Sequence, residues 1–156
     1  MRILALDQAS RTTGWCIFED GQLVKYGKFT YADENFGLRL CKIRNKVKSL
    51  IEEYNIDKLI FEDIQMQENV ETFKKLAEVF GVIYELATEL ALPNTAVLSS
   101  TWKSYLGIKG KTRDPQKASA AEYVANTFGI KPTQDECDAI CIGHYHSRFN
   151  KNNWAD

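Results

Sequence analysis

The stretch Arg2-Ile3-Leu4-Ala5-Leu6-Asp7 decides the fold, because it joins four consecutive apolar residues to a single terminal acid. Apolar residues without polar alternation are typical of a strand that other elements cover on both faces. A carboxylate at the end of such a strand is poorly solvated and needs partners. Asp7 therefore either caps the polar turn that follows it, as aspartate commonly does, or belongs to a functional site.

The rest of the chain alternates strand and helix patterns, which indicates the α/β class. Asp20-Gly21 lies between two apolar runs and is a strong hairpin signal, so we expect three antiparallel strands at the start of the chain. A helical pattern then leads to a second buried strand, which predicts a crossover to a parallel neighbour of the first strand. The predicted strands are residues 2–7, 15–18, 23–29, 58–63 and 95–98, and the predicted helices are residues 33–54, 68–90, 99–106, 116–128 and 133–149.

Length and composition indicate one globular domain. The chain has 156 residues, of which 44% are hydrophobic and 26% are charged. We expect the domain to span residues 1–150 and a polar tail to follow at 151–156. No apolar run approaches the ~20 residues of a membrane helix, and the N-terminus has no signal-peptide pattern, so we expect a cytoplasmic protein of a bacterial or phage-infected cell. The four cysteines form no Cys-x-x-Cys pair and are expected to be reduced thiols rather than zinc ligands.

Basic residues are concentrated in one region, although the net charge of −1 gives no sign of a nucleic-acid partner. Residues 107–115 have no periodicity and contain two glycines, so we expect a mobile basic loop there. A near-neutral protein can bind a polyanion through one basic face of this kind. The basic residues of the region are Lys103, Lys109, Lys111, Arg113 and Lys117, and Asp114 is its one acid.

The helix predicted at residues 68–90 has an apolar surface wider than one sheet face needs. Its apolar residues recur in alternating steps of three and four, with others beside them. Packing in the core is the default explanation, and a second apolar stripe also favours a dimer interface. The recurring residues are Phe73, Leu76, Phe80, Ile83, Ala87 and Leu90, and those beside them are Val79, Val82 and Leu86.

Four acids are candidates for a common site. Asp7 and Glu62 each end an apolar strand, and the two strands are predicted neighbours. Asp135 and Asp138 are three residues apart and share one face of the last helix. Asp135 also has a simpler explanation, because acids are favoured in the first turn of a helix. Asp138 stands among apolar residues, where an unpaired acid is costly.

If the last helix packs over the strand ends, the four acids meet and need cations to offset their repulsion. Hard divalent cations such as Mg²⁺ prefer oxygen ligands. Two such ions activate a water and stabilise the leaving oxygen of a phosphodiester, which is the chemistry of a nuclease. The basic loop suits the substrate of such an enzyme.

Three stretches resemble the RuvC family of Holliday junction resolvases, in which cellular and phage-type members look alike at this level. The stretches are residues 4–14, 61–63 and 135–139, and their order and spacing agree with the family over nearly the whole chain. Each motif alone is weak, and the three together are fairly specific. The resemblance implies an RNase H-like fold, with a mixed five-stranded sheet and helices on both faces.

The resemblance also implies a metal-dependent endonuclease that resolves four-way DNA junctions by symmetric cuts in recombination and repair. It implies a homodimer through the helix at 68–90, because two symmetric cuts need two active sites related by a twofold axis. Asp7, Glu62, Asp135 and Asp138 are implied to bind two Mg²⁺ or Mn²⁺ ions and to carry catalysis together with Lys103. The candidate DNA-binding residues are Arg11, Lys103, Lys109, Lys111, Arg113 and Lys117.

Two positions depart from the family pattern. Gln8-Ala9 replaces the usual Pro-Gly beside the first acid, and Gln65 replaces an aromatic residue able to wedge into the junction. Two alternatives therefore stay open. The first is an RNase H-like nuclease that cuts replication forks, other branched DNA or RNA–DNA hybrids. The second is a non-catalytic module that binds branched DNA, against which the four acids argue, since without metal they would only repel phosphate.

Overall fold

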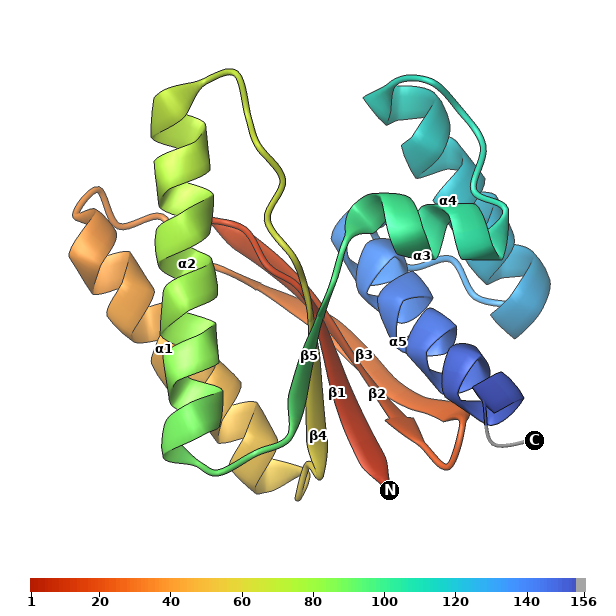
Figure 1. Ribbon diagram of the computed structural model, residues 1–156, viewed down its shortest axis with the longest axis horizontal. Coiled ribbons are helices and arrows are strands. Elements are labelled where there is room, and N and C mark those ends of the chain that lie inside the picture. Colours follow the sequence, from red (N-terminus) through yellow and green to blue (C-terminus); the bar gives the residue numbers. More distant parts are fainter. Residues whose placement is uncertain (154–156) are drawn as a thin grey trace.

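The chain forms one mixed sheet in the computed structural model, which describes residues 1–153 and the side chains of residues 1–149. The strands of these residues are β1 (Arg2–Asp7), β2 (Thr12–Glu19), β3 (Gln22–Thr30), β4 (Lys58–Glu62) and β5 (Asn94–Val97). Their order is β3-β2-β1-β4-β5, in which β1, β2 and β3 are antiparallel neighbours and β4 and β5 run parallel to β1 (Figure 1). The predicted sheet, antiparallel at its start and then parallel, is confirmed.

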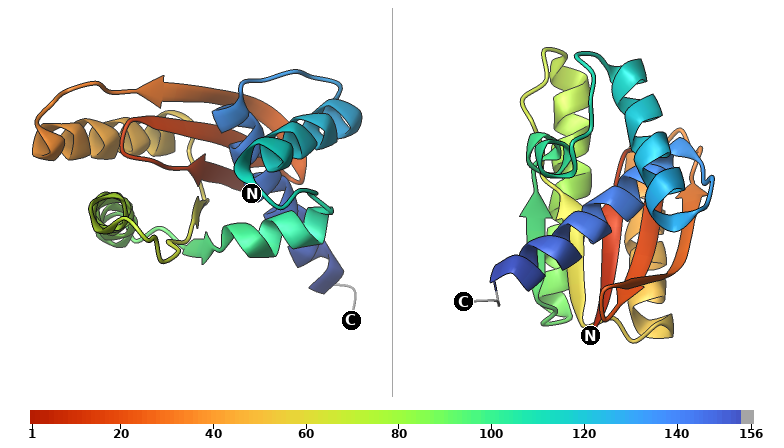
Figure 2. Two further views of the ribbon diagram at one scale, coloured as in Figure 1. Left: turned by 90° about the horizontal axis from the view of Figure 1, so that it is seen from above. Right: turned by 90° about the vertical axis from the view of Figure 1, so that its right-hand side faces the viewer.

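Helices cover both faces of this sheet, as predicted (Figures 1 and 2). One face carries α1 (Phe36–Glu53) and α2 (Val70–Glu89), and the other carries α3 (Ser99–Leu106), α4 (Arg113–Phe128) and α5 (Gln134–Asn153). Within residues 1–153, each helix is too short or too polar to span a membrane.

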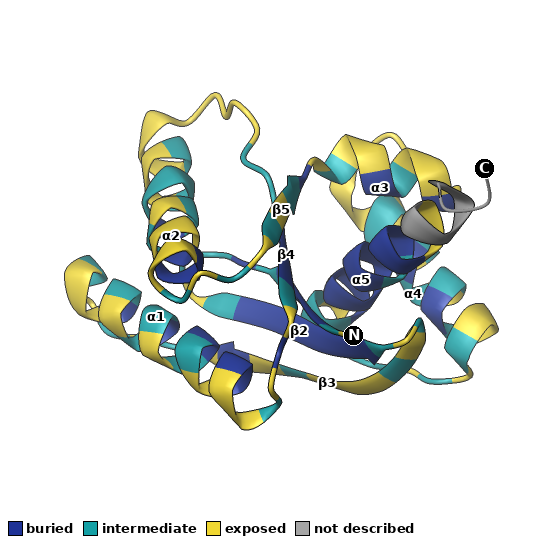
Figure 3. Cartoon of the chain, turned by 60° about the horizontal axis from the view of Figure 1, so that its bottom comes forward, coloured by how far each residue is buried: buried dark blue, intermediate teal, exposed yellow. Residues whose placement is uncertain are grey.

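The apolar run of β1 is explained by these two layers. Leu4 and Leu6 pack in the core beneath α1 and α2, whereas Ile3 and Ala5 pack in the core beneath α3, α4 and α5. Successive side chains of a strand point to opposite faces, so a strand covered on both sides has no solvent-facing positions. Figure 3 shows the buried residues gathered along the central strands and α5.

Several helix boundaries differ from the prediction; the helices predicted at 33–54 and 68–90 begin at Phe36 and Val70. The helix predicted at 116–128 begins at Arg113, so the basic loop covers residues 107–112 rather than 107–115. Pro115 falls in the first turn of α4, where a backbone N–H has no intrahelical acceptor and proline is tolerated. The last helix reaches Asn153, beyond the predicted end at 149 and into the predicted tail, of which residues 154–156 lie outside the described part.

Candidate active site

The sheet register brings Asp7 and Glu62 to the same edge. In the parallel pairing of β1 with β4, Leu6 lies opposite Phe61, and the next position on each strand is an acid. Both strands end there, so the two carboxyl groups leave the sheet at its carboxyl edge, where open α/β sheets place their ligands. The prediction that these two strands lie side by side in the sheet is confirmed.

The start of α5 is set by a contact within its first turn. Oε1 of Glu136 accepts hydrogen bonds from the backbone N of Thr133 at 2.9 Å and from its hydroxyl at 2.8 Å. A glutamate that reaches back to the residue before the helix satisfies backbone donors that otherwise have no partner. This contact fixes where α5 begins. Asp135 and Asp138 then lie three residues apart within the helix and on the same side of it.

Gly14 lets this helix start lie directly on the sheet. Gly14 is opposite Asp7 in the antiparallel pairing of β1 with β2. A Cβ atom at position 14 would lie 1.9 Å from the backbone oxygen of Asp135, which no side chain tolerates. The absence of a side chain therefore allows the first turn of α5 to lie beside Asp7.

These residues form a group that we call the acid cluster: Asp7, Glu62, Asp135 and Asp138. Burial raises the pKa of Asp7 well above its usual range, and the charges of the other three acids raise it further. Burial also raises the pKa of Glu62, a hydrogen bond from Trp102 lowers it, and the charge of Asp138 raises it again. Such shifts are typical of carboxylates that are close together and partly removed from water. The structure thus brings together the four predicted acids.

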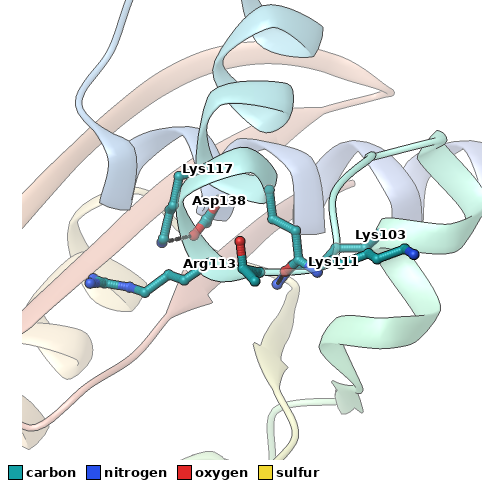
Figure 4. A pocket seen from close by; sticks show the side chains of 7 residues that line it. Lys103, Lys111, Arg113, Lys117 and Asp138 are labelled. Atoms are coloured by element: carbon teal, nitrogen blue, oxygen red, sulfur yellow. Dashed lines mark hydrogen bonds and ion pairs between the residues drawn. The ribbon is translucent and has the colours of Figure 1, made fainter.

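Lys117 extends from α4 into the acid cluster. Its Nζ donates a hydrogen bond to Oδ2 of Asp138 (Figure 4), and the two side chains are 20% and 9% exposed, respectively. Burial lowers the pKa of Lys117, but the hydrogen bond to Asp138 and the charges of the surrounding acids outweigh this effect, so the pKa is raised. The ammonium group therefore offsets part of the negative charge of the cluster.

Lys103 approaches the same acids from α3. Its Nζ donates to Oε1 of Gln116 at 3.0 Å and lies 5.3 Å from the ring centroid of Trp102. Burial raises the pKa of Glu62, while the charges of Lys103 and Lys117 lower it. Two lysines thus flank the acid cluster, both among the predicted site residues.

A pocket of about 260 Å³ opens beside Asp138, and Lys111 and Arg113 line it (Figure 4). Two hydrogen bonds tie its loop to α4: Lys109 N donates to Ser119 Oγ at 2.9 Å, and Gln116 Nε2 donates to the carbonyl oxygen of Gly110 at 3.0 Å. Its remaining lining residues are Lys103, Thr112, Gln116 and Lys117. We call this the basic pocket, and its charge suits a phosphate group.

Three residues singled out in the sequence lie outside the lining of the basic pocket. Lys109 is exposed on the loop beside it. Arg11 is exposed in the turn between β1 and β2, where its carbonyl oxygen accepts from Tyr31 N at 3.0 Å. Gln65 is exposed in the connection between β4 and α2. Arg11 and Lys109 therefore stay predictions for DNA contact.

The acid cluster does not form a ready metal site in this conformation. Within residues 1–149, no three acidic, histidine or cysteine side chains are arranged to hold one ion. Oδ2 of Asp138 accepts from Lys117, so an ammonium group lies beside this acid where a cation would bind. The residue types nevertheless fit hard divalent cations, because carboxylate oxygens are their preferred ligands and the repulsion among the acids favours a cation.

Sequence reasoning missed two residues that contact Glu62. Trp102 is 1% exposed and donates to the carboxylate, and a buried indole N–H needs such an acceptor. Gln8 is 9% exposed and is hydrogen-bonded to the backbone of Glu62. The contact of Trp102 could have been anticipated, because a buried indole N–H needs an acceptor. Nothing in the local sequence indicates that Gln8 contacts Glu62.

Comparisons with known proteins agree with this geometry. Residues 3–146 match the family model described as crossover junction endodeoxyribonuclease RuvC. The chain is 25% identical over 160 residues to the RuvC of Magnetococcus marinus, covering 99% of this chain and 87% of that protein. It is 27% identical over 152 residues to the RuvC of Geobacter sulfurreducens, covering 94% and 92%. The structure of Thermus thermophilus RuvC in complex with a Holliday junction substrate has the same fold, with a TM-score of 0.81, 16% identity and coverage of 97% and 96%.

Proposed function

Because the chain belongs to the RuvC family and is therefore a crossover junction endodeoxyribonuclease, we propose that the acid cluster is its catalytic site. The membership confirms the activity that the sequence resemblance implied, the resolution of Holliday junctions in DNA recombination and repair. The observation that carries the assignment to residues is geometric: Asp7 and Glu62 end neighbouring parallel strands, and Gly14 lets the first turn of α5, which begins at Gln134, lie beside Asp7. We also propose that one nuclease domain, residues 1–150, acts in the cytoplasm.

Members of this family are metal-dependent nucleases, and the acids of this chain would hold Mg²⁺ or Mn²⁺. We propose two ions, held by Asp7, Glu62, Asp135 and Asp138. When bound, they would supply an activated water and charge at the leaving oxygen of the phosphodiester. Asp7 and Glu62 contribute from rigid strand ends, and Asp135 and Asp138 contribute from a capped helix turn.

The basic pocket receives the DNA backbone in this proposal. Lys117, which donates to Asp138, would be displaced from it by bound cations, and its ammonium group would then be free to contact a phosphate oxygen. Lys103, held by Gln116 at the pocket wall, contacts the phosphate that is cut. Lys111 and Arg113 contact phosphates next to it, and Arg11 and Lys109 extend this contact along the strand.

We propose that the enzyme is a homodimer through α2. One side of α2 packs in the core through Val79, Ile83 and Leu86, yet Val70 is 73% exposed and Tyr84 is 54% exposed. The rings of Tyr84 and Phe80 stack with centroids 6.4 Å apart, and Phe80 also packs against Phe61 in the core, so Tyr84 extends an aromatic contact from the core to the exposed side of α2. A twofold axis through this surface gives the two active sites that paired cuts require.

One experiment tests the substrate and the mechanism together. Labelled four-way junction, replication fork, linear duplex and RNA–DNA hybrid are incubated with the protein in Mg²⁺, in Mn²⁺ or in EDTA. We expect symmetric nicks in the four-way junction with either metal and none in EDTA. Preferred cleavage of forks or hybrids would assign the site to another branch of RNase H-like nucleases, and binding without cleavage in any metal would overturn the catalytic role of the acid cluster.

A further inference from the structure

The side chain of Gln8 makes two hydrogen bonds to the backbone of one residue, Glu62. Its Nε2 donates to the carbonyl oxygen of Glu62 at 2.5 Å, and its Oε1 accepts from the N–H of Glu62 at 3.1 Å. Gln8 is 9% exposed, so water competes little with these bonds. A surface glutamine would not need this pair of contacts, and a buried one without them would be costly.

The two bonds continue the sheet where the main chain of β1 has ended. The parallel pairing of β1 with β4 stops at Leu6 and Phe61. A glutamine amide presents an N–H donor beside a carbonyl acceptor, the same pair of groups that a peptide unit offers to a neighbouring strand. Gln8 follows Asp7 directly, so the contact fixes the backbone of Asp7 relative to that of Glu62. The separation of two acids of the cluster is thereby set.

The carboxylate of Glu62 is held from the other side. Nε1 of Trp102 donates to Oε2 of Glu62 at 3.3 Å, and Trp102 is 1% exposed in the core beneath α3 and α5. The large buried ring leaves the indole N–H little freedom to move. Glu62 is thus restrained at its backbone by Gln8 and at one carboxylate oxygen by Trp102.

We propose that Gln8 and Trp102 are positioning residues that hold Glu62 in the orientation required for cation binding. This inference rests on the proposed function, in which Glu62 is a ligand of divalent cations. Groups that orient a ligand contribute strongly to metal affinity, and their loss typically costs about 10–100-fold. The family usually has proline at this position, and proline has no side-chain amide to make these bonds.

The test replaces Gln8 by a residue of similar length without polar atoms. Gln8→Met is compared with Gln22→Met, which makes the same change at an exposed position at the start of β3. Mn²⁺ binding is measured by calorimetry on the DNA-free protein, and hydrogen exchange is measured at the Glu62 amide. For Gln8→Met we expect about 10-fold or more weaker Mn²⁺ binding and faster exchange at Glu62. Gln22→Met should match the wild type in both.

Two further variants separate positioning from folding. Gln8→Asn keeps the amide but is one methylene too short to span both bonds, so it should lose Mn²⁺ affinity as Gln8→Met does. Trp102→Phe keeps most of the buried ring and removes only the donor to Oε2, and it should weaken Mn²⁺ binding while the Glu62 amide stays protected. If Gln8→Met does not fold, these two variants carry the test.

The outcomes distinguish this inference from the proposed function. Wild-type Mn²⁺ affinity in a folded Gln8→Met or Gln8→Asn variant would overturn the positioning role while the wild type still cuts the junction. A wild-type protein that neither binds Mn²⁺ nor cuts would overturn the proposed function and this inference with it. Weaker Mn²⁺ binding, with a higher Mg²⁺ concentration needed for half-maximal cleavage, would support both.

Discussion

Lys117 donates a hydrogen bond from Nζ to Oδ2 of Asp138, and it thereby places an ammonium group inside the acid cluster. A lysine so placed and a divalent cation would offset the same negative charge, so on the proposed function the two would compete for Asp138. The lysine would then stabilise the metal-free protein, and a bound cation would take over this role.

Lys117→Met should therefore destabilise the protein in EDTA, by about 1–3 kcal/mol, because a buried acid loses its donor. Saturating Mg²⁺ should reduce the difference from the wild type. Unfolding by urea with and without Mg²⁺ measures this, and Lys111→Met is the control, since Lys111 lines the same pocket and is exposed. An equal loss of stability in EDTA and in Mg²⁺ would contradict the competition.

Asp7→Asn should abolish cleavage and leave junction binding intact. Removal of a metal ligand costs several kcal/mol of transition-state stabilisation, so we expect a loss of about 100-fold or more in rate. Cleavage assays and gel-shift binding on the same junction measure the two effects. Joint loss of binding and folding would show instead that Asp7 is structural.

The same variant should change the pH dependence of stability. Burial and the neighbouring acids raise the pKa of Asp7 in the folded chain above its ordinary value of 3.8, so the folded state holds this proton more tightly than the unfolded state. The resulting stability is present below pH 3.8 and is lost as pH rises through the raised pKa. In EDTA, Asp7→Asn should therefore gain stability over the wild type as pH rises. Urea unfolding at several pH values would refute this if the difference stayed constant.

His146 should make the fold sensitive to mild acid. Burial and the charge of Lys58 lower its pKa from 6.5 to about 4, so the unfolded chain binds this proton more readily. The sign is opposite to that of Asp7: the contribution of His146 is present above pH 6.5 and is lost as pH falls towards about 4. His146→Gln should remove this part of the pH dependence of the free energy of unfolding, measured by urea unfolding at several pH values between about 4 and 6.5. The same pH dependence in both proteins would disprove the assignment.

Gly14→Ala should displace the start of α5 and separate Asp135 from Asp7. The added Cβ would meet backbone atoms of Asp135, which cannot rotate away, so we expect a loss of about 1–3 kcal/mol in stability together with reduced cleavage. Gly81→Ala is the matched control, because a Cβ there meets nothing within 4 Å. A Gly14→Ala variant with wild-type stability and activity would show that α5 does not need this close contact.

The proposed dimer can be disrupted on the exposed side of α2. Tyr84→Glu adds a charge to this side and leaves the core residues of the helix unchanged. Light scattering should give twice the chain mass of 17.8 kDa for the wild type and a single chain mass for the variant. Val24→Glu, on exposed β3, should remain dimeric. A monomeric wild type would rule out the interface.

The sequence by itself determined most of the fold and the members of the acid cluster. An unbroken apolar run at residues 3–6 is typical of a strand covered on both faces, and a hairpin signal at Asp20-Gly21 orders its neighbours. The same local rules placed Asp7 and Glu62 at strand ends and put Asp135 and Asp138 on one helix face. The predicted start of α4 is wrong because residues 113–115 show no apolar periodicity, although they form the first turn of the helix, where proline is accepted.

Only the tertiary structure decided what holds these acids. Lys117 and Asp138 are 21 residues apart, Trp102 and Glu62 are 40 apart, and Gln8 and Glu62 are 54 apart. Such contacts depend on sheet register and on how α3, α4 and α5 pack, which no local pattern encodes. Gln8 marks the difference most clearly. In the sequence it is a departure from the family pattern beside Asp7, and in the folded chain its amide joins the ends of β1 and β4.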